Sequence, residues 1–118
     1  MTENLITLTH SFLEAYPGAK GATLQSLETS LDISVGENTE IIRSLNEMTI
    51  LGIDESFDIE FSYIFSDHGT VIVFFIDPTT FLSVFTTDEF PNKALAKQMF
   101  DTYQKVFLNE FTSENQTR

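Results

Sequence analysis

Asp67 and His68 form the pattern in this 118-residue sequence that is most typical of hydrolytic acid–base chemistry. Gly69 follows the pair directly, and Asp-His-Gly between two apolar runs is also the composition of a tight turn. The sequence has no cysteine, no serine in a glycine elbow, no glycine-rich phosphate loop with lysine and no HExxH pair. We therefore predict that these residues form a turn, and that the protein is not an enzyme and holds no cofactor or metal.

Arg43 is the other residue with catalytic potential, because an arginine on a helix can stabilise phosphoryl transfer as a finger. Glu40 and Glu47 lie three residues before it and four residues after it, which is the spacing of intrahelical ion pairs. A solvated side chain, or a salt bridge with one of these glutamates, is the simpler interpretation. We keep Arg43 as a candidate contact with a partner.

Charge is the most uneven property of the chain, since eighteen acidic residues against six basic ones give a formal net charge of −12. Residues 44–92 contain nine Asp and Glu residues and no Lys or Arg. Nucleic acids and anionic membrane surfaces would be repelled, because both bind proteins through basic groups. The acids keep a phenylalanine-rich chain soluble, and they could also form an acidic face for a basic partner.

The lack of cysteine also excludes disulfides and thiolate zinc sites, and it fits a reducing compartment. No apolar run is long enough to span a bilayer, and no basic segment precedes an apolar one at the N-terminus. We therefore expect a cytoplasmic protein that does not insert into membranes.

Residues 57–86 contain three apolar runs separated by two short turn signals, which is the pattern of a three-stranded antiparallel meander. The first run, 57–66, alternates between apolar and polar residues and predicts a strand with one mostly wet face. The second run, 71–76, is apolar on both faces and belongs in the middle of a covered sheet. Helices or a partner molecule must therefore cover both faces of this sheet.

Three amphipathic patterns predict helices over residues 2–16, 36–52 and 88–111. The first ends at Pro17-Gly18, and the third begins at Asp88, a residue type that caps helices. The last residues, 113–118, are polar and are expected to form a frayed tail. The chain is therefore expected to form a single domain over residues 1–112.

Residues 22–35 fit two interpretations, and periodicity does not decide between them. As strands, they form a hairpin that turns at residues 28–30, so that the order is helix, hairpin, helix, meander, helix. As a helix capped by Thr23, they give three helices followed by strands, which is a winged-helix pattern. A winged helix with this charge would bind protein rather than DNA, because it offers no basic cluster to read bases.

The first order resembles the roadblock/dynein light chain family over nearly the whole chain. The segment PGAKGATL, residues 17–24, resembles the junction of that family where a helix stop leads into a Gly-Ala pair opening the first strand. The turns at 67–69 and 77–78 and the amphipathic C-terminal helix also match. The first hairpin departs from the pattern, because residues 28–30 (ETS) stand where members often place Asp-Gly, and its register is left open.

The resemblance implies a profilin-like α+β sandwich, in which the middle helix covers one face of a five-stranded antiparallel sheet and the terminal helices cover the other. It also implies a homodimer, or a pair with a related roadblock protein, joined through the middle helix and the edge strand after it. The implied interface residues are Ile41, Ile42, Leu45, Met48, Phe57, Ile59, Phe61 and Tyr63. The implied function is a non-enzymatic scaffold that binds or regulates a Ras-like small GTPase or a related multiprotein complex.

Overall fold

The computed structural model describes residues 2–49, 61–77, 79–87 and 92–116. Its elements follow in the order α1 (Thr2–Ala15), β1 (Ala19–Ser26), β2 (Asp32–Gly36), α2 (Thr39–Thr49), β3 (Phe61–Ser66), β4 (Gly69–Asp77), β5 (Thr80–Thr86) and α3 (Lys93–Gln116). This is the predicted order of helix, hairpin, helix, meander and helix, and it gives an α+β fold.

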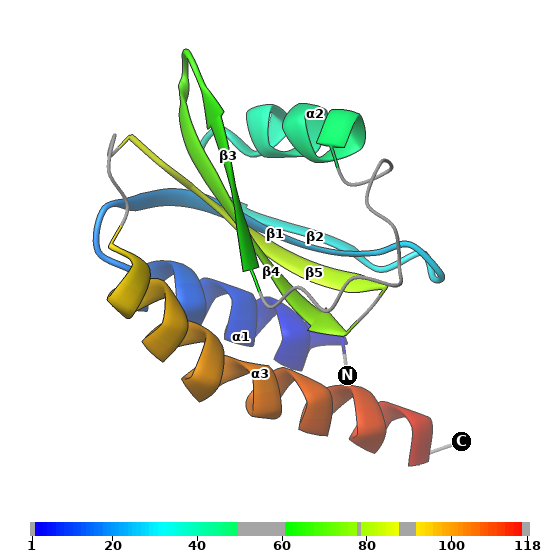
Figure 1. Ribbon diagram of the computed structural model, residues 1–118. Helices are drawn as coiled ribbons and strands as arrows, with labels where there is room; N and C mark the ends of the chain where they lie inside the picture. The colour runs from blue at the N-terminus through cyan, green and yellow to red at the C-terminus, as the bar shows by residue number, and fades with distance from the viewer. Residues whose placement is uncertain (1, 50–60, 78, 88–91, 117–118) are drawn as a thin grey trace.

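The five strands form one antiparallel sheet in the order β2-β1-β5-β4-β3. Helices α1 and α3 lie together on one face of the sheet, and α2 lies on the other (Figure 1). Every residue of β5 is buried, and β4 is buried over most of its length. This confirms the prediction that the second run of the meander is covered on both faces.

Residues 19–36 form a hairpin, so the helical interpretation of this segment is wrong and the winged-helix order with it. The turn of this hairpin contains no glycine, and side-chain hydroxyls accept hydrogen bonds from its backbone amides. Ser26 Oγ accepts hydrogen bonds from the amides of Glu28 and Thr29 at 3.2 and 3.3 Å. The resulting register places Leu24 opposite Ile33.

The larger core lies between the sheet and the layer of α1 and α3. Phe74 of β4 is its centre, with no exposed surface and ring centroids of Phe12 and Phe61 at 5.2 and 5.9 Å. Tyr103 of α3 meets Phe12 edge-to-face at 5.0 Å, so aromatic contacts join both helices to the sheet. The predicted apolar stripes of the two terminal helices therefore serve as core.

The last helix differs from its prediction at both ends. It begins at Lys93 and is capped by Asn92, whose Oδ1 accepts a hydrogen bond from the amide of Leu95 at 3.2 Å. The predicted cap, Asp88, lies outside the described residues. At its other end α3 continues to Gln116, beyond residue 112 where we expected the domain to give way to a tail.

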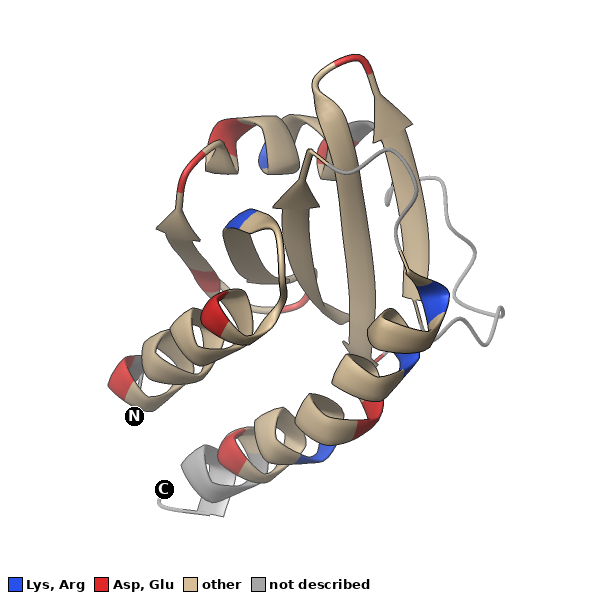
Figure 2. Cartoon of the chain, turned by 90° about the vertical axis from the view of Figure 1, so that its left-hand side faces the viewer, with Lys and Arg blue, Asp and Glu red and all other residues tan. Residues whose placement is uncertain are grey.

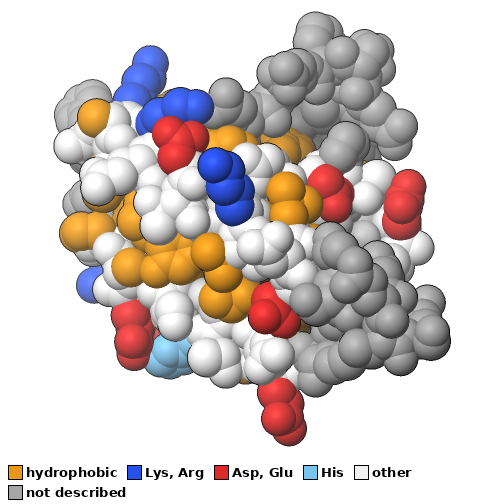
Figure 3. All heavy atoms as spheres, turned by 90° about the horizontal axis from the view of Figure 1, so that it is seen from below, with side chains coloured by type: hydrophobic (Ala, Val, Ile, Leu, Met, Phe, Trp, Pro, Cys, Tyr) orange, Lys and Arg blue, Asp and Glu red, His pale blue; other side chains and the backbone are white. Residues whose placement is uncertain are grey.

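The outer side of the α1 and α3 layer is partly apolar. Seen from below, hydrophobic side chains gather at the surface of this layer (Figure 3). Ile6 of α1 and Val106 of α3 are 43% and 39% exposed. No helix within the described ranges is long and apolar enough to cross a membrane.

Candidate interaction surface

A second, smaller core lies under α2. Ile42, which has no exposed surface, packs there with four buried side chains of the central strands: Val71, Val73, Phe81 and Phe85. Leu45, Ile64 and Phe75 are only partly buried and pack against the margin of the same cluster. The helix therefore contributes one fully buried apolar side chain and leaves further apolar surface beside it.

The middle of the contact between α2 and the sheet is polar, which the sequence pattern did not predict. Asn46 is 3% exposed and its Nδ2 donates hydrogen bonds to Ser83 Oγ at 3.0 Å and to Gln25 Oε1 at 3.3 Å. Its Oδ1 is buried and has no hydrogen-bond partner among the described residues. The apolar stripe of this helix was expected to bury apolar side chains. The buried amide of Asn46 reduces the stabilisation that this face provides, because an unsatisfied buried polar group costs free energy.

Arg43 forms an ion pair with the edge strand β2, which corrects the prediction that it pairs with Glu40 or Glu47. Its guanidinium nitrogens lie 2.6 and 2.7 Å from the two carboxylate oxygens of Asp32, and it also donates to Ser34 Oγ. The hydrogen bond to Asp32, with the charge of that carboxylate, raises the pKa of Arg43 against an opposing effect of burial. The guanidinium therefore ties α2 to the sheet.

Substitution Arg43→Ala should cost about 0.5–1 kcal/mol of unfolding free energy, since the side chains of the pair are 35% and 48% exposed. Urea unfolding at low salt measures this. The difference from the parent should shrink at high salt, because exposed ion pairs are screened. A loss of several kcal/mol that salt does not change would contradict this account.

β3 is an edge strand of the sheet and pairs only with β4. Its other edge presents backbone groups that no strand among the described residues covers, a form that accepts a strand from another chain. The side chains of Phe61 and Tyr63 pack against the larger core, toward α1 and α3. Phe65 stacks on Tyr63 at 6.1 Å and is 66% exposed, which makes it the most exposed large apolar side chain among the described residues.

Tyr63 carries a buried hydroxyl that has no hydrogen-bond partner among the described residues. Burial raises its pKa, because the phenolate would be poorly solvated. Ionisation of this group therefore leaves folding stability unchanged below the unfolded value of about 10, and stability falls as the pH rises from there through the higher folded pKa, because the unfolded chain loses the proton first.

Substitution Tyr63→Phe should raise the unfolding free energy at neutral pH by about 1 kcal/mol, because it removes an unsatisfied buried polar group. The variant should also lose less stability than the parent above about pH 10. Chemical unfolding across an alkaline pH series measures both effects. Destabilisation by the phenylalanine at neutral pH would show that the hydroxyl has a partner after all.

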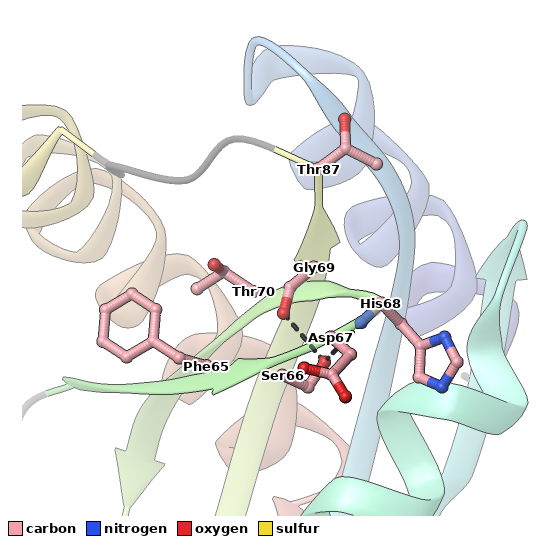
Figure 4. A pocket seen from close by; sticks show the side chains of 7 residues that line it. All are labelled: Phe65, Ser66, Asp67, His68, Gly69, Thr70 and Thr87. Carbon is pink, nitrogen blue, oxygen red and sulfur yellow. Dashed lines mark hydrogen bonds between the residues drawn. The ribbon is translucent and has the colours of Figure 1, made fainter.

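The turn between β3 and β4 borders a hollow of about 240 Å³. Its lining comes from residues 65–70 and Thr87 (Figure 4). Ser66 Oγ accepts from the amide of His68 at 3.3 Å and donates to the carbonyl of Gly69, which has a φ of 146°. Asp67 and His68 are exposed, and no hydrogen bond between their side chains is found in the described structure. Asp67 and His68 therefore form the turn between the two strands, as the sequence predicted.

The predicted interface residues fall into three groups. Ile41 and Leu45 lie one helical turn apart on α2 and are half-buried, so they still offer apolar surface. Ile42, Phe61 and Tyr63 have their side chains in contacts within the chain. The side chain of Met48, and Phe57 and Ile59, lie outside the described part.

We call the half-buried apolar patch with its neighbouring strand the α2/β3 surface. It consists of Leu45, Ile64 and Phe75, which pack against one cluster, of half-buried Ile41 one turn before Leu45 on α2, and of the edge of β3 that no described strand covers. Acidic residues lie along α2 and at the tip of the β3–β4 hairpin, as the charge-coloured view shows (Figure 2). This surface combines apolar side chains and an open strand edge with acidic residues on the same elements, which suits binding of another protein.

These layers and this strand order are those of the roadblock fold. The crystal structure of MglC from Myxococcus xanthus matches with a TM-score of 0.62 at 11% identity, over 88% of this chain and 96% of that one. A Roadblock/LC7 domain from Streptomyces avermitilis matches with a TM-score of 0.53 at 15% identity, over 87% and 97%. No protein-family model and no curated protein matches the sequence. At these identities the similarity establishes the fold.

Proposed function

We propose that this protein is a non-enzymatic platform subunit that pairs with a second roadblock-type subunit through the α2/β3 surface. The second subunit is another copy of the chain or a related chain. The observation that carries the proposal is the edge of β3 that no described strand covers, together with Leu45 of α2 and Ile64 of β3, which are partly buried against the same cluster, on a fold of this type. Pairing would extend the sheet across two subunits and bury the patch.

We propose further that the paired platform binds a Ras-like small GTPase, in the cytoplasm. This step rests on the resemblance to the roadblock/dynein light chain family and on the fold. Arg43 is an unfavourable candidate for an arginine finger, because Asp32 and Ser34 already hold its guanidinium. The expected role is therefore binding or assembly, with any hydrolytic residues supplied by the GTPase itself.

Substitution Ile41→Asp tests the pairing surface. A carboxylate at the centre of a pairing interface should weaken association by about 100-fold or more, because the charge would lose its water. Sedimentation velocity over a concentration series measures the association constant. The matched control is Ile6→Asp on the outside of α1, where the parent side chain is 43% exposed on the opposite face of the sheet.

The GTPase step needs its own measurement. Ras-like small GTPases, loaded in turn with GDP and with a non-hydrolysable GTP analogue, are titrated against the parent and the Ile41→Asp variant. We expect at least one to bind the parent and to bind the variant more weakly. Retained pairing in Ile41→Asp would contradict the surface, and a parent that pairs but binds none of the GTPases would contradict the GTPase step alone.

A further inference from the structure

Exposed carboxylates lie just before α2, along α2 and at the tip of the β3–β4 hairpin. Glu37, Glu40, Glu47 and Asp67 are all exposed, and none has an ion-pair partner within the described structure. Arg43 is the one Lys or Arg in residues 39–49 and 61–77, and Asp32 holds it. The guanidinium of Arg43 is therefore paired within the chain and does not neutralise these carboxylates.

The other basic groups do not neutralise these carboxylates, because many of them lie in the layer on the opposite face of the sheet. Lys93, Lys97 and Lys105 belong to α3, across the sheet from α2 (Figures 1 and 2). Lys97 also pairs with Asp101 at 3.3 Å on its own helix. The α1 and α3 layer therefore carries charges of both signs, with Glu3 and Glu14 on α1, whereas α2 and the β3–β4 hairpin have no Lys or Arg besides Arg43 among their described residues.

Two identical copies joined through this surface would bring two sets of these carboxylates to one interface rim. Like charges placed together at an interface oppose association, and they do so most at low salt. The net charge of −12 on each copy adds a general repulsion. The apolar centre and the strand edge favour pairing, while the acidic residues oppose pairing with an identical chain.

We propose that the preferred occupant of the α2/β3 surface is a non-identical subunit that presents an apolar patch surrounded by Lys or Arg. This inference rests on the proposed function, because it names the partner chemistry of the same surface. Such a subunit would keep the apolar contact and replace repulsion at the rim by attraction. Self-association of this chain would be weak at low salt and stronger as salt screens the carboxylates.

A charge-reversed form of the chain itself serves as the basic partner in the test. The double variant Glu40→Lys/Glu47→Lys is mixed with the parent, and association is measured by sedimentation velocity at low and at high salt. At low salt the mixture should associate about tenfold or more tightly than the parent with itself. This advantage should largely disappear at high salt.

The matched control is Glu3→Lys/Glu14→Lys, which makes the same charge change on exposed positions of α1, on the other face. Its mixture with the parent should gain much less, because the reversed charges are not at the rim. Adding Ile41→Asp to the charge-reversed partner should abolish the gain, which places the contact on this surface.

The outcomes separate this inference from the proposed function. A parent that pairs with itself as tightly as with the charge-reversed form, without salt dependence, overturns the partner chemistry and leaves the pairing surface intact. An equal gain from the α1 control also overturns it, because net charge alone would then explain the effect. No association in any mixture overturns both this inference and the pairing surface.

Discussion

Substitution Phe74→Ala should lower the unfolding free energy by about 3–5 kcal/mol, the usual cost of removing a buried phenylalanine ring. Phe74 has no exposed surface and its ring lies within contact distance of Phe12, Tyr16 and Phe61. The cavity would therefore open between the sheet and α1, where neighbouring side chains must move to fill it. Urea unfolding followed by circular dichroism measures the change.

Phe65→Ala is the control for Phe74→Ala, because it removes the same ring from a side chain that is 66% exposed. Its cost should stay within about 0.5 kcal/mol, as for other surface substitutions. A domain of this size has a total stability of about 5–15 kcal/mol, so Phe74→Ala should leave a marginal or unfolded protein. Equal effects of the two substitutions would contradict the assignment of the larger core.

Substitution Gly21→Ala should cost about 3 kcal/mol or more, because an added methyl group has no room. A Cβ on Gly21 would lie 1.9 Å from the backbone oxygen of Glu37 and 2.9 Å from its carbonyl carbon. The amide of Glu37 donates to the carbonyl of Lys20 at 2.8 Å, so the chain between β2 and α2 is held against β1. Either the segment between β2 and α2 or strand β1 must shift to make room for the methyl group.

Lys20→Ala is the neighbouring control, since Lys20 is exposed and the substitution adds no atoms. It should change the unfolding free energy by less than about 0.5 kcal/mol. Thermal unfolding of both variants provides the comparison. Gly21→Ala with near-parent stability would show that the segment between β2 and α2 can move away from β1. The close approach of Glu37 would then not explain why residue 21 is a glycine.

The order of elements could be predicted from the sequence because its strongest patterns are long. The meander over residues 57–86 has three apolar runs, the first with period two, and turn residues between them, and α1 and α3 have apolar residues at helical spacing. The hairpin of residues 19–36 could not be decided from periodicity, because its leucines fit a helix as well as a strand. Its turn uses the hydroxyls of Ser26 and Thr29, which leave no signal as clear as Asp-Gly.

The contacts of α2 could not be predicted, because they join residues distant in the sequence. The pair of Arg43 with Asp32 spans eleven positions, and local spacing favoured glutamates on the same helix. Asn46 has the character of a solvent-facing residue until Ser83, thirty-seven positions away, is placed beneath it. The interface set was likewise predicted as one group, whereas Ile42 is buried within its own chain and Ile41 remains half-buried.

Pairing through the free edge of β3 is the central claim, and amide hydrogen exchange on that strand tests it most directly. Isotopically labelled parent protein is mixed with unlabelled Glu40→Lys/Glu47→Lys at low salt, and exchange of residues 61–66 is compared with that of the parent alone. We predict new protection at alternate amides of β3, as expected where a second strand pairs with one edge. Unchanged exchange on β3 with new protection on β2, α1 or α3 would contradict the claim.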